Sequence, residues 1–184
     1  MREPIQRLAG VSRVTVNDRL VLSEAIPVSE TADTGDFNRF YRVEADRLFK
    51  ALAIALGDVD LAREAVDEGM VRAYQRWKKV GAYDSPAGWV YRVSLNWARN
   101  RVRNRQREVL TTEWSDEAVV DDIDPDLQRA LDTLSVDARS VVVLRYLLGW
   151  STADTAQALG VTPGTVKSRL SRALDRLETL LEER

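Results

Sequence analysis

Residues 151–177 constrain the fold of this chain more than any other stretch, because they carry the signals of two short helices joined by a tight turn. Ser151 followed three residues later by Asp154 is a capping box, which predicts that a helix begins there. Gly160 can adopt the left-handed conformation that ends a helix, and the Thr-Pro pair two residues later can begin the next one. The stretch therefore predicts a helix-turn-helix.

The second of these helices has one apolar side and one side suited to contact DNA. Apolar residues recur at three- and four-residue steps from Val166 to Leu177, which predicts a buried stripe. The other side carries short or cationic side chains, where a helix-turn-helix contacts base edges and phosphates in the major groove. A solvated surface helix would look similar, but the preceding helix and the glycine turn favour nucleic-acid binding. The candidate DNA contacts are Thr162, Thr165, Lys167, Ser168, Arg169, Ser171 and Arg172.

The composition narrows what the rest of the chain can do. The 184 residues can form one medium domain or two small ones, and the net charge is only −2. Without cysteine or histidine, the chain lacks the usual zinc ligands and two common catalytic groups, so we expect no metal site, no cofactor and no catalytic residue. No apolar run approaches a membrane span and no signal-peptide core is present, which predicts a cytoplasmic protein without direct membrane insertion.

The first half of the chain predicts two helices after a segment without a clear period. We expect residues 1–35 to be a poorly ordered extension. Residues 36–56 show a wide apolar face and end at a glycine, and residues 61–79 form a second helix capped by Asp58 or Asp60. We expect the inner side of this second helix to bury Leu61, Ala65, Val66, Ala73, Tyr74 and Trp77. Its outer side carries Glu64, Asp67, Glu68 and Arg72, and such an acidic stripe is most often a solvated face.

A third helix is predicted to begin at Ser85-Pro86 and to be strongly cationic on its outer side. Six arginines and no acidic residue lie between Arg92 and Arg107, an arrangement that favours binding to phosphate. Exposed aromatic and asparagine side chains beside arginine can stack on and hydrogen-bond an unpaired base. The side chains expected to face inward are Trp89, Val90, Val93, Trp97 and Val102, and for each tryptophan core packing is favoured over a DNA contact.

The sign of the charge reverses after this helix. Residues 108–126 contain eight acidic residues and no lysine or arginine, and their apolar residues show no period, which predicts a linker. Helical patterning resumes at 127–134 and 136–148, and these two helices would support the helix-turn-helix.

The C-terminal residues also resemble a known family. Residues 139–173, above all the run GTVKSRLSRA at 164–173, are similar to the promoter-reading C-terminal domain of bacterial extracytoplasmic-function (ECF) sigma factors, members of the sigma-70 superfamily. LRY at 144–146 and GWS at 149–151 extend the match. The chain departs from the family pattern at Thr155, where a larger aliphatic residue is usual, and at Ser135, where a proline commonly opens the domain.

The resemblance implies an all-α fold of two small helical domains joined by an acidic linker, the C-terminal one a helix-turn-helix. The expected division is a 1–35 extension, a 36–107 domain that binds core RNA polymerase and recognises and melts the −10 element, a 108–126 linker, and a 127–184 domain that recognises the −35 element. The implied function is that of an alternative sigma factor, which directs promoter recognition and DNA opening while the polymerase performs the chemistry.

The resemblance also assigns roles to individual residues. Glu64, Asp67, Glu68 and Arg72 match the surface that docks on a coiled coil of the polymerase clamp. The segment that captures and melts the −10 element corresponds to Tyr83, Asp84, Trp89, Arg92, Asn96, Arg99 and Arg103. The expected partners are core RNA polymerase, through its clamp coiled coil and its flap, promoter DNA and an anti-sigma factor.

Two other functions fit parts of the sequence. A stand-alone helix-turn-helix regulator would bind duplex DNA as a dimer without polymerase, but it does not explain the polarised linker. A helical enzyme or partner-binding bundle could use Glu64 and Asp67 as paired acids, but no glycine-rich phosphate loop, metal-ligand cluster or nucleophile with its base is found in the sequence.

Overall fold

The computed structural model describes residues 32–108 and 124–182, and in this part of the chain helices joined by turns and loops are the only regular structure, with no strand. The predicted all-α fold is therefore confirmed. The N-terminal unit comprises α2 (Ala32–Leu56), α3 (Val59–Gln75), α4 (Trp77–Val80) and α5 (Pro86–Glu108). The C-terminal unit comprises α6 (Pro125–Asp132), α7 (Val136–Tyr146), α8 (Thr152–Leu159) and α9 (Pro163–Glu182). Most of the expected extension at 1–35 and of the expected linker at 108–126 lies outside the described residues.

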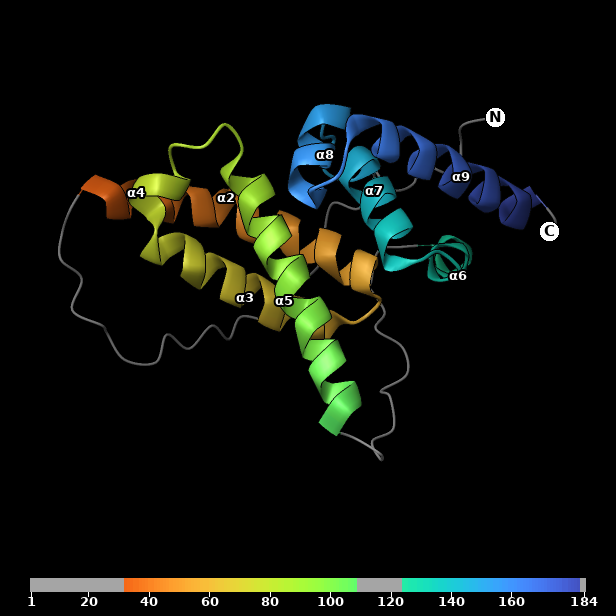
Figure 1. Ribbon diagram of the computed structural model, residues 1–184, viewed down its shortest axis with the longest axis horizontal. Coiled ribbons are helices and arrows are strands. Elements are labelled where there is room, and N and C mark those ends of the chain that lie inside the picture. The colour runs from red at the N-terminus through yellow and green to blue at the C-terminus, as the bar shows by residue number, and fades with distance from the viewer. Residues whose placement is uncertain (1–31, 109–123, 183–184) are drawn as a thin grey trace.

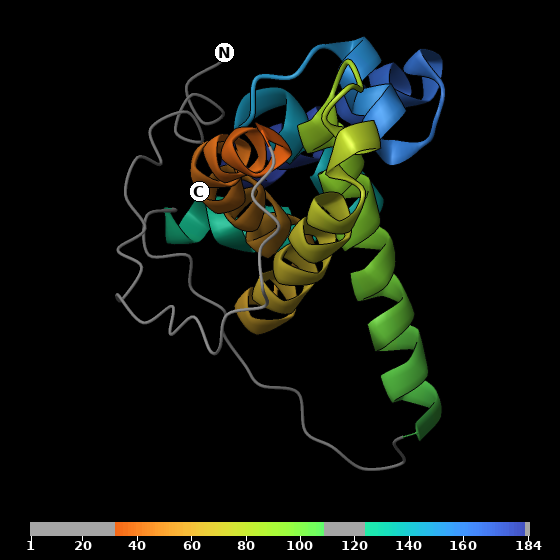
Figure 2. The same ribbon diagram turned by 90° about the vertical axis from the view of Figure 1, so that its left-hand side faces the viewer.

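In the N-terminal unit, α3 packs against both α2 and α5 (Figures 1 and 2). Asp58 begins α3 as its N-cap, because its carboxylate accepts a hydrogen bond from the Leu61 amide at 2.8 Å. The Ser85 hydroxyl accepts from the Gly88 amide at 3.1 Å and begins α5 in the same way. In Figure 2 the C-terminal half of α5 extends beyond the other helices.

The predicted continuous helix over 61–79 is wrong. Arg76, at φ −125° and ψ 22°, leaves helical geometry, so α3 ends at Gln75 and the short α4 follows. The break accompanies close ring packing, since Trp77 lies 5.2 Å from Phe37 and 4.9 Å from Phe40 between ring centroids. Tyr74, which we expected to be buried, is 42% exposed.

The buried face of α5 is rotated by about one residue from the predicted stripe. Val90 is buried as expected, but Tyr91, Leu95 and Ala98 are also buried, whereas the other expected members of the stripe, Trp89, Val93, Trp97 and Val102, are only half-buried. Helix α5 packs on two sides, because it contacts α8 of the C-terminal unit as well as α2 and α3. The prediction assumed one buried stripe, which holds only for a helix that packs against a single surface.

The two units pack directly against each other in the described part of the chain. Helix α2 contacts α7, α5 contacts α8, and one buried apolar cluster extends from Phe37 in α2 to Leu177 in α9. Figure 1 shows α7 and α8 lying beside α2 and the N-terminal half of α5. Among the described helices, none has both the length and the apolar character needed to cross a membrane.

Candidate nucleic-acid interface

The helix-turn-helix forms as predicted from residues 151–177. The Ser151 hydroxyl accepts from the Asp154 amide at 3.0 Å, and the Asp154 carboxylate accepts from the Ser151 amide at 3.2 Å, which completes the capping box. Gly160 ends α8 at φ 67°, a left-handed conformation that glycine adopts without strain. The Thr162 hydroxyl then accepts from the Thr165 amide at 3.2 Å where α9 begins.

Helix α9 buries one side and exposes the other, as its pattern predicts. Val166, Ala173 and Leu177 are buried against the other C-terminal helices. The exposed residues on the opposite side include Thr162, Lys167, Ser168, Ser171 and Arg172, whereas Thr165 and Arg169 are half-buried. This surface combines cationic and hydroxyl groups on the N-terminal half of a recognition helix, so it can contact both phosphates and base edges.

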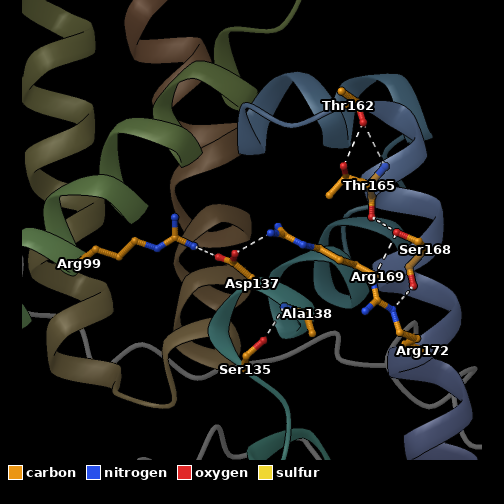
Figure 3. Close-up of polar contacts among 9 residues, drawn as sticks. All are labelled: Arg99, Ser135, Asp137, Ala138, Thr162, Thr165, Ser168, Arg169 and Arg172. Carbon is orange, nitrogen blue, oxygen red and sulfur yellow. Dashed lines mark hydrogen bonds and ion pairs between the residues drawn. The ribbon is translucent and has the colours of Figure 1, made fainter.

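Arg172 lies along its own helix rather than on another element. Its Nε donates to the Ser168 carbonyl oxygen at 3.1 Å, and the Ser168 hydroxyl donates to the Thr165 carbonyl oxygen at 3.1 Å (Figure 3). Both contacts are exposed, and neither involves a carboxylate. The guanidinium of Arg172 can therefore turn toward DNA without breaking an ion pair.

Two of the candidate arginines meet at a single carboxylate. Asp137, in the first turn of α7, lies between Arg99 of α5 and Arg169 of α9 in Figure 3. Its Oδ2 is 2.9 Å from Arg169 Nη2, and its Oδ1 accepts a hydrogen bond from Arg99 Nη2. The −10 and −35 candidate sets, which are separate in sequence, are thus joined in space at Asp137.

The other −10 candidates lie on α5 and on the loop before it. Of these, Tyr83, Asp84, Arg92, Asn96 and Arg103 are exposed, and Trp89 is half-buried against the main apolar cluster. Among the described residues, Arg103 hydrogen-bonds only within its own helix, where its Nη2 donates to Asn100 at 2.9 Å. The arginines of α5 face different surroundings, because Arg101 and Arg105 lie 3.8 and 3.9 Å from Glu64 of α3.

The four polymerase-binding candidates lie on α3, with Glu68 half-buried and the rest exposed. Glu68 accepts a hydrogen bond from Arg72 one turn later at 2.7 Å. Asp67 is exposed as a whole, but its carboxyl group is partly buried, and this burial raises its pKa. The positive charge of the neighbouring Arg63 offsets part of the rise. The negative charge of the acidic groups on this face is therefore partly neutralised by arginines of α3 and α5.

Sequence reasoning missed Asp137, Arg139 and Tyr91. Tyr91 is fully buried on α5 and its ring meets Trp150 of the C-terminal unit at 6.1 Å in an edge-on arrangement. Asp137 had one visible signal, since an acidic residue in the first turn of a helix is typical of an N-terminus. Nothing in that signal points to two arginines on other helices.

Comparisons with known proteins agree with this geometry. Residues 125–177 match the family described as "Sigma-70, region 4". The chain is 37% identical over 155 residues to an RNA polymerase sigma-E factor of Streptomyces avermitilis, an alignment covering 81% of this chain and 87% of that protein. It is 32% identical over 163 residues to the ECF RNA polymerase sigma factor SigL of Mycobacterium tuberculosis, covering 83% and 92%.

A solved structure is similar over nearly the same extent. The sigma factor RpoE of Bartonella quintana, solved in complex with the anti-sigma factor NepR, aligns with a TM-score of 0.66 and 27% identity. The alignment covers 80% of this chain and 97% of that one, so the likeness includes both helical units. With these matches and a helix-turn-helix whose exposed face carries Lys167 and Arg172, the chain belongs to the ECF RNA polymerase sigma factors.

Proposed function

We propose that this chain carries out transcription initiation with its two units divided between the two promoter elements. Helix α9 reads the −35 element through Lys167, Ser168 and Arg172, with Thr162, Thr165, Arg169 and Ser171 beside them. Helix α5 and the preceding loop capture and open the −10 element. The chain makes and breaks no covalent bond itself, because the polymerase supplies the chemistry.

The observation that carries this proposal is the exposed face of α9. Lys167 and Arg172 project from the helix of a fully capped helix-turn-helix, and no carboxylate pairs with Arg172 in the described part of the chain. Lysine and arginine at such positions bind phosphates and the acceptor atoms of guanine, and serine can contact any base. The exposed Arg92, Asn96 and Arg103 give α5 the same chemistry together with the half-buried Trp89.

The acidic face of α3 is the proposed contact with core polymerase. Glu64, Asp67 and Arg72 are exposed there, and charges at the rim of an interface guide association. The polymerase clamp coiled coil would take this face, and the flap would take the C-terminal unit. We further propose a cytoplasmic location and regulation by an anti-sigma factor, supported by the similarity to RpoE, which was solved bound to NepR.

Promoter selection with purified components tests the proposal. Core RNA polymerase transcribes a library of genomic fragments with and without this chain, and the transcripts are sequenced. We expect a new set of start sites that share two elements upstream, and we expect a variant carrying both Lys167→Ala and Arg172→Ala to lose that set. Identical start sites with and without the chain would remove the proposal.

A further inference from the structure

We propose that the described arrangement is a closed resting state, in which the Asp137 carboxylate stands in for a DNA phosphate. It holds Arg99 of α5 and Arg169 of α9 at the same time, so each proposed DNA-binding helix has an arginine engaged by the chain itself. This inference rests on the proposed function, since it concerns how that DNA-binding surface is made available.

The geometry of the bridge resembles the way two arginines bind one phosphate. Each carboxylate oxygen of Asp137 takes one guanidinium, Oδ1 from Arg99 and Oδ2 from Arg169, the latter at 2.9 Å. Arginine binds carboxylate and phosphate with the same planar set of donors. Neither arginine can serve Asp137 and a DNA phosphate with the same donors, so promoter DNA and Asp137 compete.

The bridge is weak enough to be displaced. The side chains of Arg99 and Asp137 are 42% and 43% exposed, and solvent-exposed ion pairs contribute little to stability. Phosphate backbones offer many negative charges and release counterions on binding. DNA can therefore compete with this one carboxylate for the two arginines, whereas full separation of the units would also expose the apolar cluster that they share.

The closed state also covers part of α5 sterically. The Arg92 guanidinium lies against the turn of the helix-turn-helix, where a Cβ atom added to Gly160 would fall 2.5 Å from Arg92 Nη2. A Cβ atom added to Gly88 would lie 3.6 Å from the Cβ of Ala158 in α8. Two arginines of the −10 set are thus engaged by the C-terminal unit, Arg99 through charge and Arg92 through close contact.

Two polar groups buried between the units have no hydrogen-bond partner in the described part of the chain. Tyr91 of α5 and Ser140 of α7 are both buried, and neither hydroxyl has a partner at hydrogen-bonding geometry in the described part of the chain. The Ser140 hydroxyl is nevertheless close enough to influence Tyr91. A buried polar group without a partner destabilises the arrangement that buries it, so opening would return these hydroxyls to water and recover part of that loss.

The bridge couples the two proposed DNA sites. DNA that takes Arg169 leaves Asp137 with one partner and weakens the closed state, which makes α5 more accessible. The reverse holds for DNA that takes Arg99, because coupling between two binding sites is reciprocal. Binding at one promoter element would then favour binding at the other.

The absence of cysteine from the sequence allows a direct test on the full chain. Cysteines replacing the exposed Lys78 of α4 and Glu178 of α9 would carry a donor and an acceptor dye, one on each unit. Energy transfer is compared between the parent chain, Asp137→Asn and Asp175→Asn. The last variant removes the same charge from an exposed position on α9 and serves as the matched control.

We expect Asp137→Asn to lower energy transfer, with no change for Asp175→Asn. Added salt should lower energy transfer in the parent chain and in the control, and much less in Asp137→Asn, because it screens the bridge. Arg99→Gln breaks the bridge from α5 and leaves α7 intact, so it should reproduce the change even where Asp137→Asn disturbs the helix. Equal transfer in all four chains would overturn the closed state.

Binding of a labelled promoter duplex to the same chains tests whether the closed state blocks DNA. Asp137→Asn should bind more tightly than Asp175→Asn by roughly two- to fivefold, the ratio that corresponds to loss of exposed ion pairs. Equal affinities would overturn the blocking role. Promoter selection with core polymerase is scored separately, so that result would leave the proposed function standing, whereas unchanged start sites would remove it whatever the dyes report.

Discussion

Arg139 of α7 donates a hydrogen bond to the Ile54 carbonyl oxygen of α2 at 3.3 Å, so a buried guanidinium of the C-terminal unit satisfies the last turns of a helix in the N-terminal unit. The same group forms an ion pair with Asp132 at 3.1 Å and donates to the Leu134 carbonyl oxygen at 3.2 Å. Burial lowers the pKa of Arg139, and the charge of Asp132 raises it. The bond to Ile54 crosses between the units, whereas Asp132 and Leu134 belong to the same unit as Arg139.

Replacing the Arg139 side chain should destabilise the folded chain. Arg139→Met would leave the carbonyl groups of Ile54 and Leu134 without their donor, and we expect the free energy of unfolding to fall by about 2–3 kcal/mol. Arg129→Met is the matched control, because the Arg129 side chain is 59% exposed and its ion pair with Asp126 is solvated, so its cost should stay below about 1 kcal/mol. Urea unfolding compares the two, and similar costs would contradict the role given to Arg139.

Removing the Thr155 hydroxyl should make the folded chain more stable. The residue is fully buried in α8, and its hydroxyl has no hydrogen-bond partner among the described residues. Thr155→Val keeps the shape and removes the uncompensated polar group, so we expect stabilisation of about 1 kcal/mol.

The same substitution at Thr133 should lower the stability of the folded chain. Its hydroxyl donates to the Ala130 carbonyl oxygen at 2.8 Å and accepts from Arg176 Nε at 3.1 Å, and Thr133→Val would lose both bonds. Thermal and urea unfolding measure the pair of variants. Destabilisation by both changes would mean that Thr155 has a partner after all.

Tyr91 should make the chain lose stability in alkali. Burial raises the pKa of Tyr91 from 10.0 to about 12, and Ser140 and Arg99 lower it only in part. Above pH 10 the unfolded chain ionises this phenol while the folded chain retains the proton, so stability falls with rising pH until about pH 12. The full loss would be roughly 2.7 kcal/mol at about 1.36 kcal/mol per pKa unit.

Tyr91→Phe isolates this contribution, since all other groups titrate in both chains. The stability of the parent chain relative to the variant should be constant below pH 10 and should decline above it. Urea unfolding at a series of pH values gives the difference. Parallel curves across the alkaline range would show that Tyr91 does not titrate as a buried phenol.

Arg172 should control discrimination among −35 sequences. It is exposed, and its only hydrogen bonds in the described residues are to Ser168 of the same helix. Arg172→Ala should reduce the preference for the best sequence over a single mismatch at the base it reads by about 1–3 kcal/mol. Competition binding with matched and mismatched duplexes measures this preference.

Arg176→Ala is the control for Arg172, because it removes the same charge one turn later in α9. Arg176 is exposed but its Nε donates to the Thr133 hydroxyl, on the side of α6. Its loss should weaken binding to all duplexes equally. A uniform loss for Arg172→Ala as well would contradict a base-reading role.

The features that the sequence predicts correctly are local. The capping box at Ser151, the left-handed turn at Gly160 and the buried stripe from Val166 to Leu177 depend on residues close together in the chain, and all three form. The start of α5 at Ser85 is also correct. Each of these signals is complete within a few residues, so no knowledge of the tertiary contacts is needed.

The features it misses depend on contacts between distant segments. Arg99 and Asp137 are 38 residues apart in the sequence, and Arg139 and Ile54 are 85 apart. Tyr91 is buried because the C-terminal unit covers it, which no pattern within α5 encodes. Even the break at Arg76 accompanies the packing of Trp77 on rings of α2.

The function proposed for α5 and the preceding loop is opening of the −10 element, and permanganate reactivity of unpaired thymines reports that opening at single bases. A promoter fragment selected with this chain is treated in the presence of core RNA polymerase, alone and with the chain or its Arg103→Ala variant. We expect reactive thymines at the −10 element only when the chain is present, and fewer with Arg103→Ala at equal promoter occupancy. A −10 element that stays double-stranded with the chain bound, or that opens equally with core polymerase alone, would contradict the function proposed for α5.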